Sequence, residues 1–132
     1  MVIAQREFRY GINKTILEVS GGVSKPGQTL EDTARAEFFE ETGYVPGTLT
    51  RLKETVYPDP ASITFPFAFF LATDCTLQGE QKLDYGEYVE VVLIPLDVWL
   101  GDIWAGRISD LKTIAITMLA LPYLKDTFNI KL

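Results

Sequence analysis

The sequence predicts an α/β sandwich built around a mixed β-sheet. Short runs with the composition of β-strands are interspersed with segments of helical periodicity. Their order lacks the strict strand–helix alternation of a doubly wound parallel fold. A length of 132 residues and a hydrophobic content of 47% suit one packed core. We therefore expect residues 1–132 to form a single domain.

The first half of the chain is predicted to contain two strands and a polar helix. Residues 1–10 and 15–20 are β-type runs joined by a short turn. A glycine-rich loop over residues 21–27 follows. Thr29 is a suitable N-cap for the helix, and Gly43 is a common type of residue at a helix end.

The second half is predicted to contain three strands and two helices. Pro66 lies inside one of these strands and indicates a bulge or an edge position, because proline lacks the N–H of a ladder hydrogen bond. Ser109 and Asp110 are N-cap residues for the last helix. The expected elements are strands at 47–56, 63–73 and 89–94, a helix at 95–105, and a final helix after Asp110.

Charge and composition exclude several classes of function. The 18 acidic and 12 basic residues give a net charge of −6, which argues against nucleic acid as a partner. With no His and the single Cys75, a zinc site of imidazole and thiolate ligands is excluded, and any metal is expected among oxygen ligands. No apolar run is long enough for a membrane span, and residues 1–10 are too charged for a signal peptide, so we expect a cytoplasmic protein.

Three glutamates gather on one face of the first predicted helix. Glu37, Glu40 and Glu41 stand at i, i+3 and i+4, which places them within about 100° of arc. The helix has no Lys or Arg at a spacing that would pair with them, and like charges at i, i+4 repel. Oxygen ligands in this arrangement suit Mg²⁺ or Mn²⁺. The alternative interpretation is a solvated acidic helix end.

The glycines on either side of this helix favour the metal site. The segment GGVSKPGQTLEDTARAEFFEETGY resembles the Nudix box, G-x5-E-x7-R-E-U-x-E-E-x-G-U, where U is a bulky aliphatic residue. Five of its seven Gly, Glu or Arg positions are kept, namely Gly22, Glu37, Glu40, Glu41 and Gly43. Gln28 replaces a glutamate and Ala36 replaces the arginine, while Arg35 stands one position early. A one-residue shift turns a side chain by about 100°, so we do not expect Arg35 to replace the missing guanidinium.

The resemblance extends along most of the chain. Residues 6–22 (REFRYGINKTILEVSGG), 57–62 and 106–113 look like segments of ADP-ribose pyrophosphatases and related nucleotide-sugar hydrolases. This implies a Nudix-type α/β/α sandwich. Those relatives have N-terminal strands before the equivalent of Met1, so the resemblance implies an N-terminally shortened domain. Because a bare sheet edge is a hazard, we expect a homodimer or a short substitute strand to cover it.

The family resemblance also implies a set of site residues. Glu37, Glu40 and Glu41 would be catalytic and hold Mg²⁺ or Mn²⁺, with the Gly21 carbonyl as a further ligand. A fourth acid is expected from the loop at 74–88. Glu87 is preferred because it lies next to a strand, with Glu80 and Asp84 as rivals. The expected substrate-binding residues are Arg9, which would contact the diphosphate, with Arg6 and Tyr57.

The predicted function is metal-dependent hydrolysis of a nucleoside diphosphate linked to another group, with ADP-ribose or a nucleotide sugar as first candidates. A nucleotide-binding or regulatory module of the same fold with impaired catalysis is the alternative, because Gln28 and Ala36 depart from the motif. A purely structural dimer subunit is a third interpretation. It predicts neither metal nor nucleotide binding.

Overall fold

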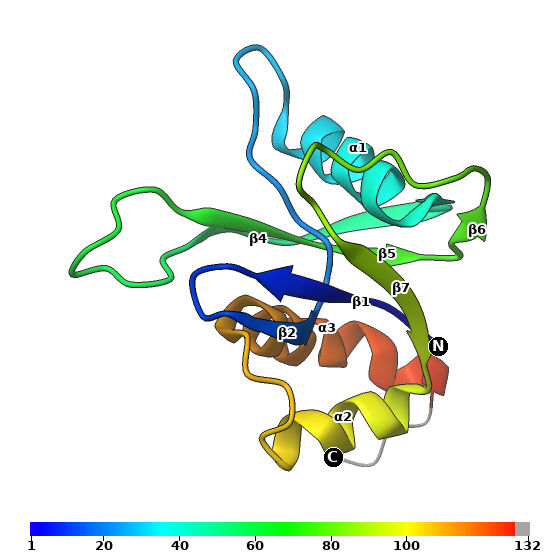
Figure 1. The fold of residues 1–132 in the computed structure, drawn as a ribbon. Coiled ribbons are helices and arrows are strands. Elements are labelled where there is room, and N and C mark those ends of the chain that lie inside the picture. The colour runs from blue at the N-terminus through cyan, green and yellow to red at the C-terminus, as the bar shows by residue number, and fades with distance from the viewer. Residues whose placement is uncertain (129–132) are drawn as a thin grey trace.

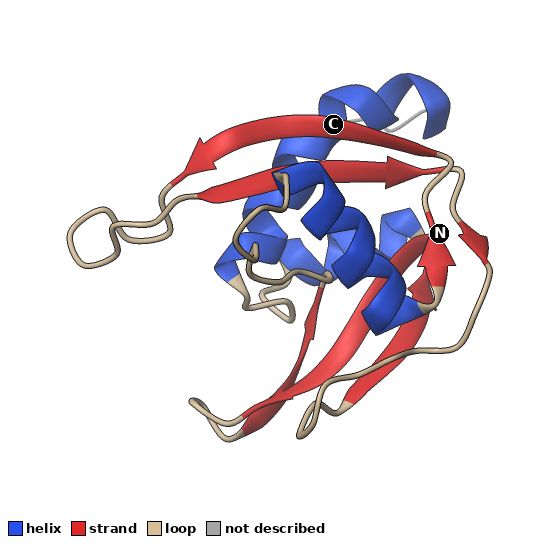
Figure 2. Ribbon diagram, turned by 90° about the horizontal axis from the view of Figure 1, so that it is seen from above, coloured by secondary structure: helices blue, strands red, loops and turns tan. Residues whose placement is uncertain are grey.

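The computed structural model, which describes residues 1–128 with side chains through Lys125, has helices on both sides of its strands. Helix α1 (Leu30–Thr42) lies on one side, and α2 (Leu96–Trp104) and α3 (Leu111–Phe128) lie on the other (Figure 1). Viewed from above, α1 lies between two groups of strands (Figure 2). The predicted α/β class is therefore confirmed.

The strands form three hydrogen-bonded groups. A three-stranded sheet has the order β2-β1-β7, and β4-β5 and β3-β6 are separate pairs. Every pairing within residues 1–128 is antiparallel, whereas we expected a mixed sheet. Strand direction depends on which strands pair, and strand propensity alone does not identify those partners. The strands are β1 (Val2–Arg9), β2 (Lys14–Glu18), β3 (Tyr44–Val45), β4 (Thr48–Val56), β5 (Phe67–Thr73), β6 (Thr76–Leu77) and β7 (Val89–Ile94).

One predicted strand boundary and one predicted loop were wrong. Strand β5 begins at Phe67, directly after Pro66, and not at residue 63. The proline thus excludes the preceding residues from the ladder instead of bulging within it. The loop expected at 74–88 contains the short strand β6, which pairs with β3 just after α1.

Local signals define α1 as predicted. The Thr29 hydroxyl accepts a hydrogen bond from the backbone N–H of Asp32 at 3.1 Å, which caps the N-terminus. Gly43 adopts a left-handed conformation with φ 74°, and its N–H donates to the Phe39 carbonyl at 2.8 Å. The helix therefore ends immediately after the three glutamates.

A hydrophobic core lies between the three-stranded sheet and the C-terminal helices, and it supports the strands that carry the site. Ala4 of β1 packs with Trp99 and Ile108, all of which are buried. Asp110 caps α3 as expected, accepting from the Thr113 N–H at 2.9 Å. The Thr113 hydroxyl in turn accepts from the Val19 N–H at 3.1 Å. Helix α3 thereby fixes the chain just before the glycine-rich loop.

No helix within residues 1–128 has the length and apolar character that a membrane crossing requires.

Candidate active site

Strand β1 presents a polar face toward α1. Because side chains alternate along a strand, Gln5, Glu7 and Arg9 share the face opposite Ala4, which points into the core. Gln5 and Glu7 are buried, with exposed fractions of 1% and 6%. Burial of such side chains is costly unless they are hydrogen-bonded or paired, so this face is built for a polar site.

Glu41 is the most deeply buried of the predicted glutamates. Its Oε2 atom accepts hydrogen bonds from Gln5 Nε2 at 2.8 Å and from the backbone N–H of Gly21 at 3.2 Å. Burial raises the pKa of Glu41 from 4.5 to about 7. The two hydrogen bonds oppose this rise, and the charges of Glu7 and Glu37 add to it. The carboxylate is held in one orientation at an energetic cost that a nearby cation would relieve.

Glu37 lies against the backbone of Gly22. A Cβ atom at Gly22 would lie 2.1 Å from Glu37 Cδ, so only glycine leaves room for this carboxyl group. Burial, followed by the charge of Glu40, raises the pKa of Glu37. The first glycine of the box thus accommodates the first glutamate of the helix.

The loop before β7 is docked onto the end of α1. The Lys82 N–H donates to the Glu40 carbonyl at 2.7 Å, and Gln81 Nε2 donates to the Glu41 carbonyl at 2.6 Å. Within this loop the Glu87 carboxylate accepts from the Asp84 N–H at 2.8 Å. The charges of Glu87 and Asp84 contribute to the raised pKa of Glu37, which places both near the helix.

The acidic side chains at this end of α1 are of the type that binds a divalent cation. Within the described residues, no three Asp, Glu or Cys side chains converge as a preformed metal site. However, Glu37 and Glu41 repel each other, and Glu40 and Glu87 add charge to the same region. Such hard oxygen donors, which outnumber the cationic side chains near them, suit Mg²⁺ or Mn²⁺, which bind a few carboxylates and keep several waters. The residues therefore fit the cation by their chemistry.

A second pair of carboxylates, Glu7 and Glu18, lies beside the α1 glutamates, and it was not predicted from the sequence. Arg9 Nε donates to Glu18 Oε1 at 2.7 Å, and Arg9 Nη1 lies 2.8 Å from Glu7 Oε1. Glu18 is completely buried. Neither Glu7 Oε2 nor Glu18 Oε2 has a hydrogen-bond partner among residues 1–128. The signal that could have predicted this part of the site is the alternation of the polar residues Gln5, Glu7 and Arg9 along β1.

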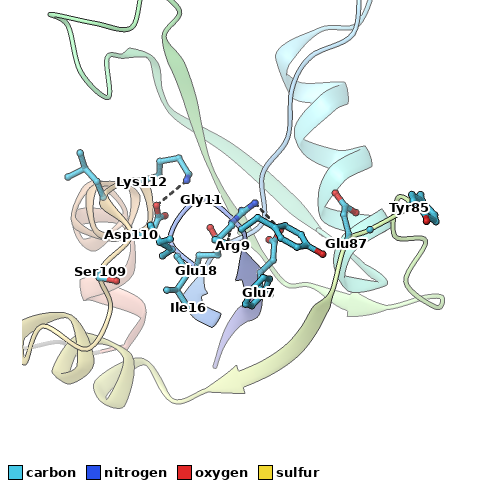
Figure 3. A pocket seen from close by; sticks show the side chains of 15 residues that line it. Glu7, Arg9, Gly11, Ile16, Glu18, Tyr85, Glu87, Ser109, Asp110 and Lys112 are labelled. Carbon is cyan, nitrogen blue, oxygen red and sulfur yellow. Dashed lines mark hydrogen bonds and ion pairs between the residues drawn. The ribbon is translucent and has the colours of Figure 1, made fainter. Parts of the chain in front are cut away.

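These side chains border a cavity of about 680 Å³. Figure 3 shows Arg9 in the middle, Asp110 and Lys112 on one side, and Tyr85 and Glu87 on the other. Lys112 Nζ lies 3.0 Å from Asp110 Oδ1. Burial would raise the pKa of Asp110, but its hydrogen bonds to Thr113 and Lys112 outweigh this and lower it. Arg9 and Lys112 give the cavity two cationic side chains suited to phosphate oxygens.

Two predicted substrate residues lie apart from this group. Arg6 is on the opposite face of β1, where it forms an exposed ion pair with Glu90 at 3.2 Å. Tyr57 follows β4 and does not line the cavity. The loop between β4 and β5 projects from the end of the sheet (Figure 1). The structure thus brings Arg9, Gly21 and Glu87 to the α1 glutamates, but not Arg6 or Tyr57.

The positions that depart from the box have local structural roles. The Gln28 side-chain oxygen accepts from the Lys25 N–H at 3.2 Å within the glycine-rich loop. Arg35 forms an exposed ion pair with Glu31 at 3.1 Å, one helical turn away. It therefore contacts none of the three box glutamates, as the shift in position predicted.

Comparison with known proteins relates this chain to a family. The NUDIX domain pattern matches residues 1–111. The chain is 32% identical over 113 residues to an ADP-ribose pyrophosphatase of Bacillus subtilis (strain 168), covering 85% of this chain and 60% of the relative. It is 34% identical over 110 residues to a GDP-mannose pyrophosphatase of Yersinia enterocolitica (serotype O:8 / biotype 1B), covering 80% of this chain and 55% of the relative. The chain therefore spans little more than half the length of these curated relatives.

The fold also matches a solved structure. The crystal structure of an ADP compounds hydrolase superposes with a TM-score of 0.83 at 23% sequence identity, covering 97% of this chain and 68% of that chain. The predicted Nudix-type fold is thereby confirmed. Because the domain pattern covers residues 1–111, with more than 30% identity to named pyrophosphatases, the chain belongs to the Nudix hydrolase family.

Proposed function

We propose that this protein hydrolyses the diphosphate linkage of a nucleoside diphosphate joined to a second group, with ADP-ribose or a nucleotide sugar as the substrate. The observation that carries the proposal is the buried Glu41 carboxylate, fixed by Gln5 and Gly21 beside Glu37. Family membership supports the reaction type. The names of the two pyrophosphatase relatives support the substrate class.

In this proposal the helix and the glycine-rich loop hold the cation. Glu37, Glu40 and Glu41 would bind Mg²⁺ or Mn²⁺ with the carbonyl of Gly21. A bound cation would neutralise charge on the diphosphate oxygens and favour ionisation of an attacking water. The protein supplies the orientation of the carboxylates and excludes water from Glu41, which is only 7% exposed.

Arg9 and Glu87 have separate proposed roles. Arg9 binds diphosphate oxygens, and its orientation is fixed by the buried Glu18 and Glu7. Glu87 accepts the Asp84 N–H with one carboxylate oxygen, Oε2, which leaves Oε1 to accept a proton from the attacking water. The water oxygen then bonds to one phosphorus, the bridging oxygen leaves with the other phosphate, and two monophosphates are released.

A nucleotide-binding module without catalysis remains the second candidate. It is favoured by one observation, namely that Arg35 pairs with Glu31 and so provides no guanidinium to the box glutamates. Under this alternative the chain binds the cation and the nucleotide but releases no monophosphate.

The two candidates are separated by following monophosphate formation chromatographically. The purified protein is incubated with ADP-ribose, GDP-mannose and ADP-glucose, with Mg²⁺ and with EDTA. Hydrolysis predicts Mg²⁺-dependent release of two monophosphates from at least one compound. Saturable nucleotide binding without product would favour the binding module. Absence of both would contradict both proposals.

We also propose that residues 1–132 form one domain that acts as a homodimer. The β2-β1-β7 sheet and the β4-β5 pair leave unpaired strand edges within the described residues. An edge strand is a template for pairing with a second chain.

A further inference from the structure

The amide of Gln5 is buried against the Glu41 carboxylate, and the α1 motif does not predict it. Gln5 lies in β1, 36 residues before Glu41 in the sequence, and is 1% exposed. We propose that Gln5 is a positioning residue that occupies one oxygen of Glu41 and leaves the other free for the cation. This inference rests on the proposed function, because it assigns a partner to a ligand of that site.

The hydrogen bonds divide the two oxygens of Glu41 between separate roles. Oε2 accepts from Gln5 Nε2 at 2.8 Å and from the Gly21 N–H at 3.2 Å. Oε1 accepts no hydrogen bond from the described part of the protein, and it is not among the fully buried unpaired atoms. With Oε2 occupied twice, the carboxylate is held against rotation about its terminal bond. In this proposal Oε1 is the oxygen left to bind a cation.

The neighbouring charges explain why an amide suits position 5. Glu7 lies two residues along the same face of β1, and Glu18 is directly opposite Gln5 in the register with β2. An acid at position 5 would add a negative charge to this group. An apolar side chain would remove the stronger of the two donors to Oε2. A neutral donor avoids both effects.

The nitrogen of the amide is also the atom expected to face Glu41. An amide carbonyl in that position would place two acceptors in contact, which is unfavourable in a buried site. The partners that orient a metal ligand are typically worth about 10- to 100-fold in metal affinity or activity. We expect an effect in this range from Gln5.

The test compares Gln5→Met and Gln5→Glu with the wild-type protein. Methionine has a similar length but no donor, and glutamate adds charge at the same place. Thr117→Val is the matched control, because it removes a buried hydrogen bond from Trp99 Nε1 at 3.1 Å in the layer of α2 and α3. Binding of Mn²⁺ alone is measured from the free-ion paramagnetic resonance signal, and kcat and KM are measured with Mg²⁺. Circular dichroism and thermal unfolding verify folding.

We expect Gln5→Met to weaken Mn²⁺ binding and lower kcat by about 10- to 100-fold, with KM changed less than about twofold. Gln5→Glu should be affected more strongly, and Thr117→Val should lose stability but keep both constants. Wild-type Mn²⁺ affinity and kcat in a folded Gln5→Met protein would overturn the inference while leaving the proposed function intact. If Gln5→Met does not fold, Gln5→Leu is measured against the same criterion. A wild-type protein that binds no Mn²⁺ would contradict the proposed function, and the inference with it.

Discussion

The chemistry of Glu41 follows from its burial between a helix and a strand. Removal from water makes the charged carboxylate unfavourable, and hydrogen bonds from Gln5 and Gly21 compensate only in part. The result is a pKa of about 7. With this raised pKa, Glu41 makes the free energy of unfolding depend on pH even without substrate.

We predict that the metal-free protein becomes less stable as pH rises from 4.5 to about 7. In this window the unfolded chain has Glu41 ionised, whereas the folded protein keeps it protonated, so folding takes up a proton and weakens as pH rises. The difference between 4.5 and about 7 corresponds to up to about 3 kcal/mol. The raised pKa values of Glu37 and Glu7 act in the same direction.

Urea unfolding in EDTA at pH 5 and pH 7.5 measures this effect. Glu41→Gln should flatten the dependence, because the amide does not titrate. Saturating Mg²⁺ should restore stability at pH 7.5, since a ligand that binds the folded state stabilises it. A wild-type protein that gains stability between pH 5 and pH 7.5 in EDTA would be inconsistent with a buried Glu41.

Gly22→Ala is predicted to impair the cation site with little effect on the fold. The added Cβ would meet the end of the flexible Glu37 side chain at 2.1 Å, so the carboxyl group must move aside while the backbone stays in place. We expect at least tenfold weaker Mn²⁺ binding and a change in unfolding free energy below about 1 kcal/mol. Gly101→Ala, where a Cβ meets no described atom within 4 Å, is the control for both measurements. Unchanged Mn²⁺ affinity in Gly22→Ala would exclude Glu37 as a ligand.

Local sequence predicted part of the site and missed the rest for a physical reason. Glu37 and Glu41 share a helix, so spacing alone predicted that they lie together. Gln5, Glu7 and Glu18 enter the site through the pairing of β1 with β2 and the packing of α1 on that sheet. Such long-range pairing is not encoded in any one segment. This limit also explains why Arg6, which neighbours Gln5 in sequence, lies on the other face.

At the scale of elements, the junction between α1 and the loop that carries Glu87 depends on Gly43. Its φ of 74° is unfavourable for other residues, and a Cβ would lie 2.3 Å from the Gly79 carbonyl oxygen. The Gln78 N–H also donates to the Gly43 carbonyl at 3.0 Å. The end of α1 and the loop therefore pack against each other at Gly43.

We predict that Gly43→Ala destabilises the protein more than Gly27→Ala. Gly27 has a similarly positive φ of 85°, but a Cβ there meets no described atom within 4 Å, so this variant measures the backbone strain alone at about 1–2 kcal/mol. Gly43→Ala adds a clash with backbone and should cost at least about 1 kcal/mol more. Chemical denaturation of both variants gives the difference. Equal losses would mean that the loop is not packed against Gly43 in solution.

The elements were predicted best where their ends carry local signals. Thr29 and Gly43 defined α1, and Asp110 defined the start of α3. Strand β6 was missed because its two residues form a strand only by pairing with β3. The direction of the strand pairings was missed for the same reason, since it depends on partners distant in sequence.

At the scale of the whole molecule, the open strand edges lead to the predicted homodimer. Within residues 1–128, the strand order leaves β2 and β7 at the edges of the three-stranded sheet, where a second chain can pair. Sedimentation equilibrium should give twice the mass of the chain at micromolar concentration. Denaturation should show one cooperative transition that shifts to higher denaturant as protein concentration rises. A monodisperse monomer at high concentration would refute the dimer.

The most direct measurement of the central claim, that the α1 carboxylates gather a divalent cation for hydrolysis, is Mg²⁺-dependent turnover of ADP-ribose by Glu41→Gln. Glu31→Gln is the matched control, because Glu31 lies on the same helix in an exposed ion pair with Arg35. We expect Glu41→Gln to fold and lose at least about 100-fold in kcat, with Mn²⁺ binding weakened in parallel, while Glu31→Gln resembles the wild type. Full Mg²⁺-dependent turnover by a folded Glu41→Gln protein would contradict the account.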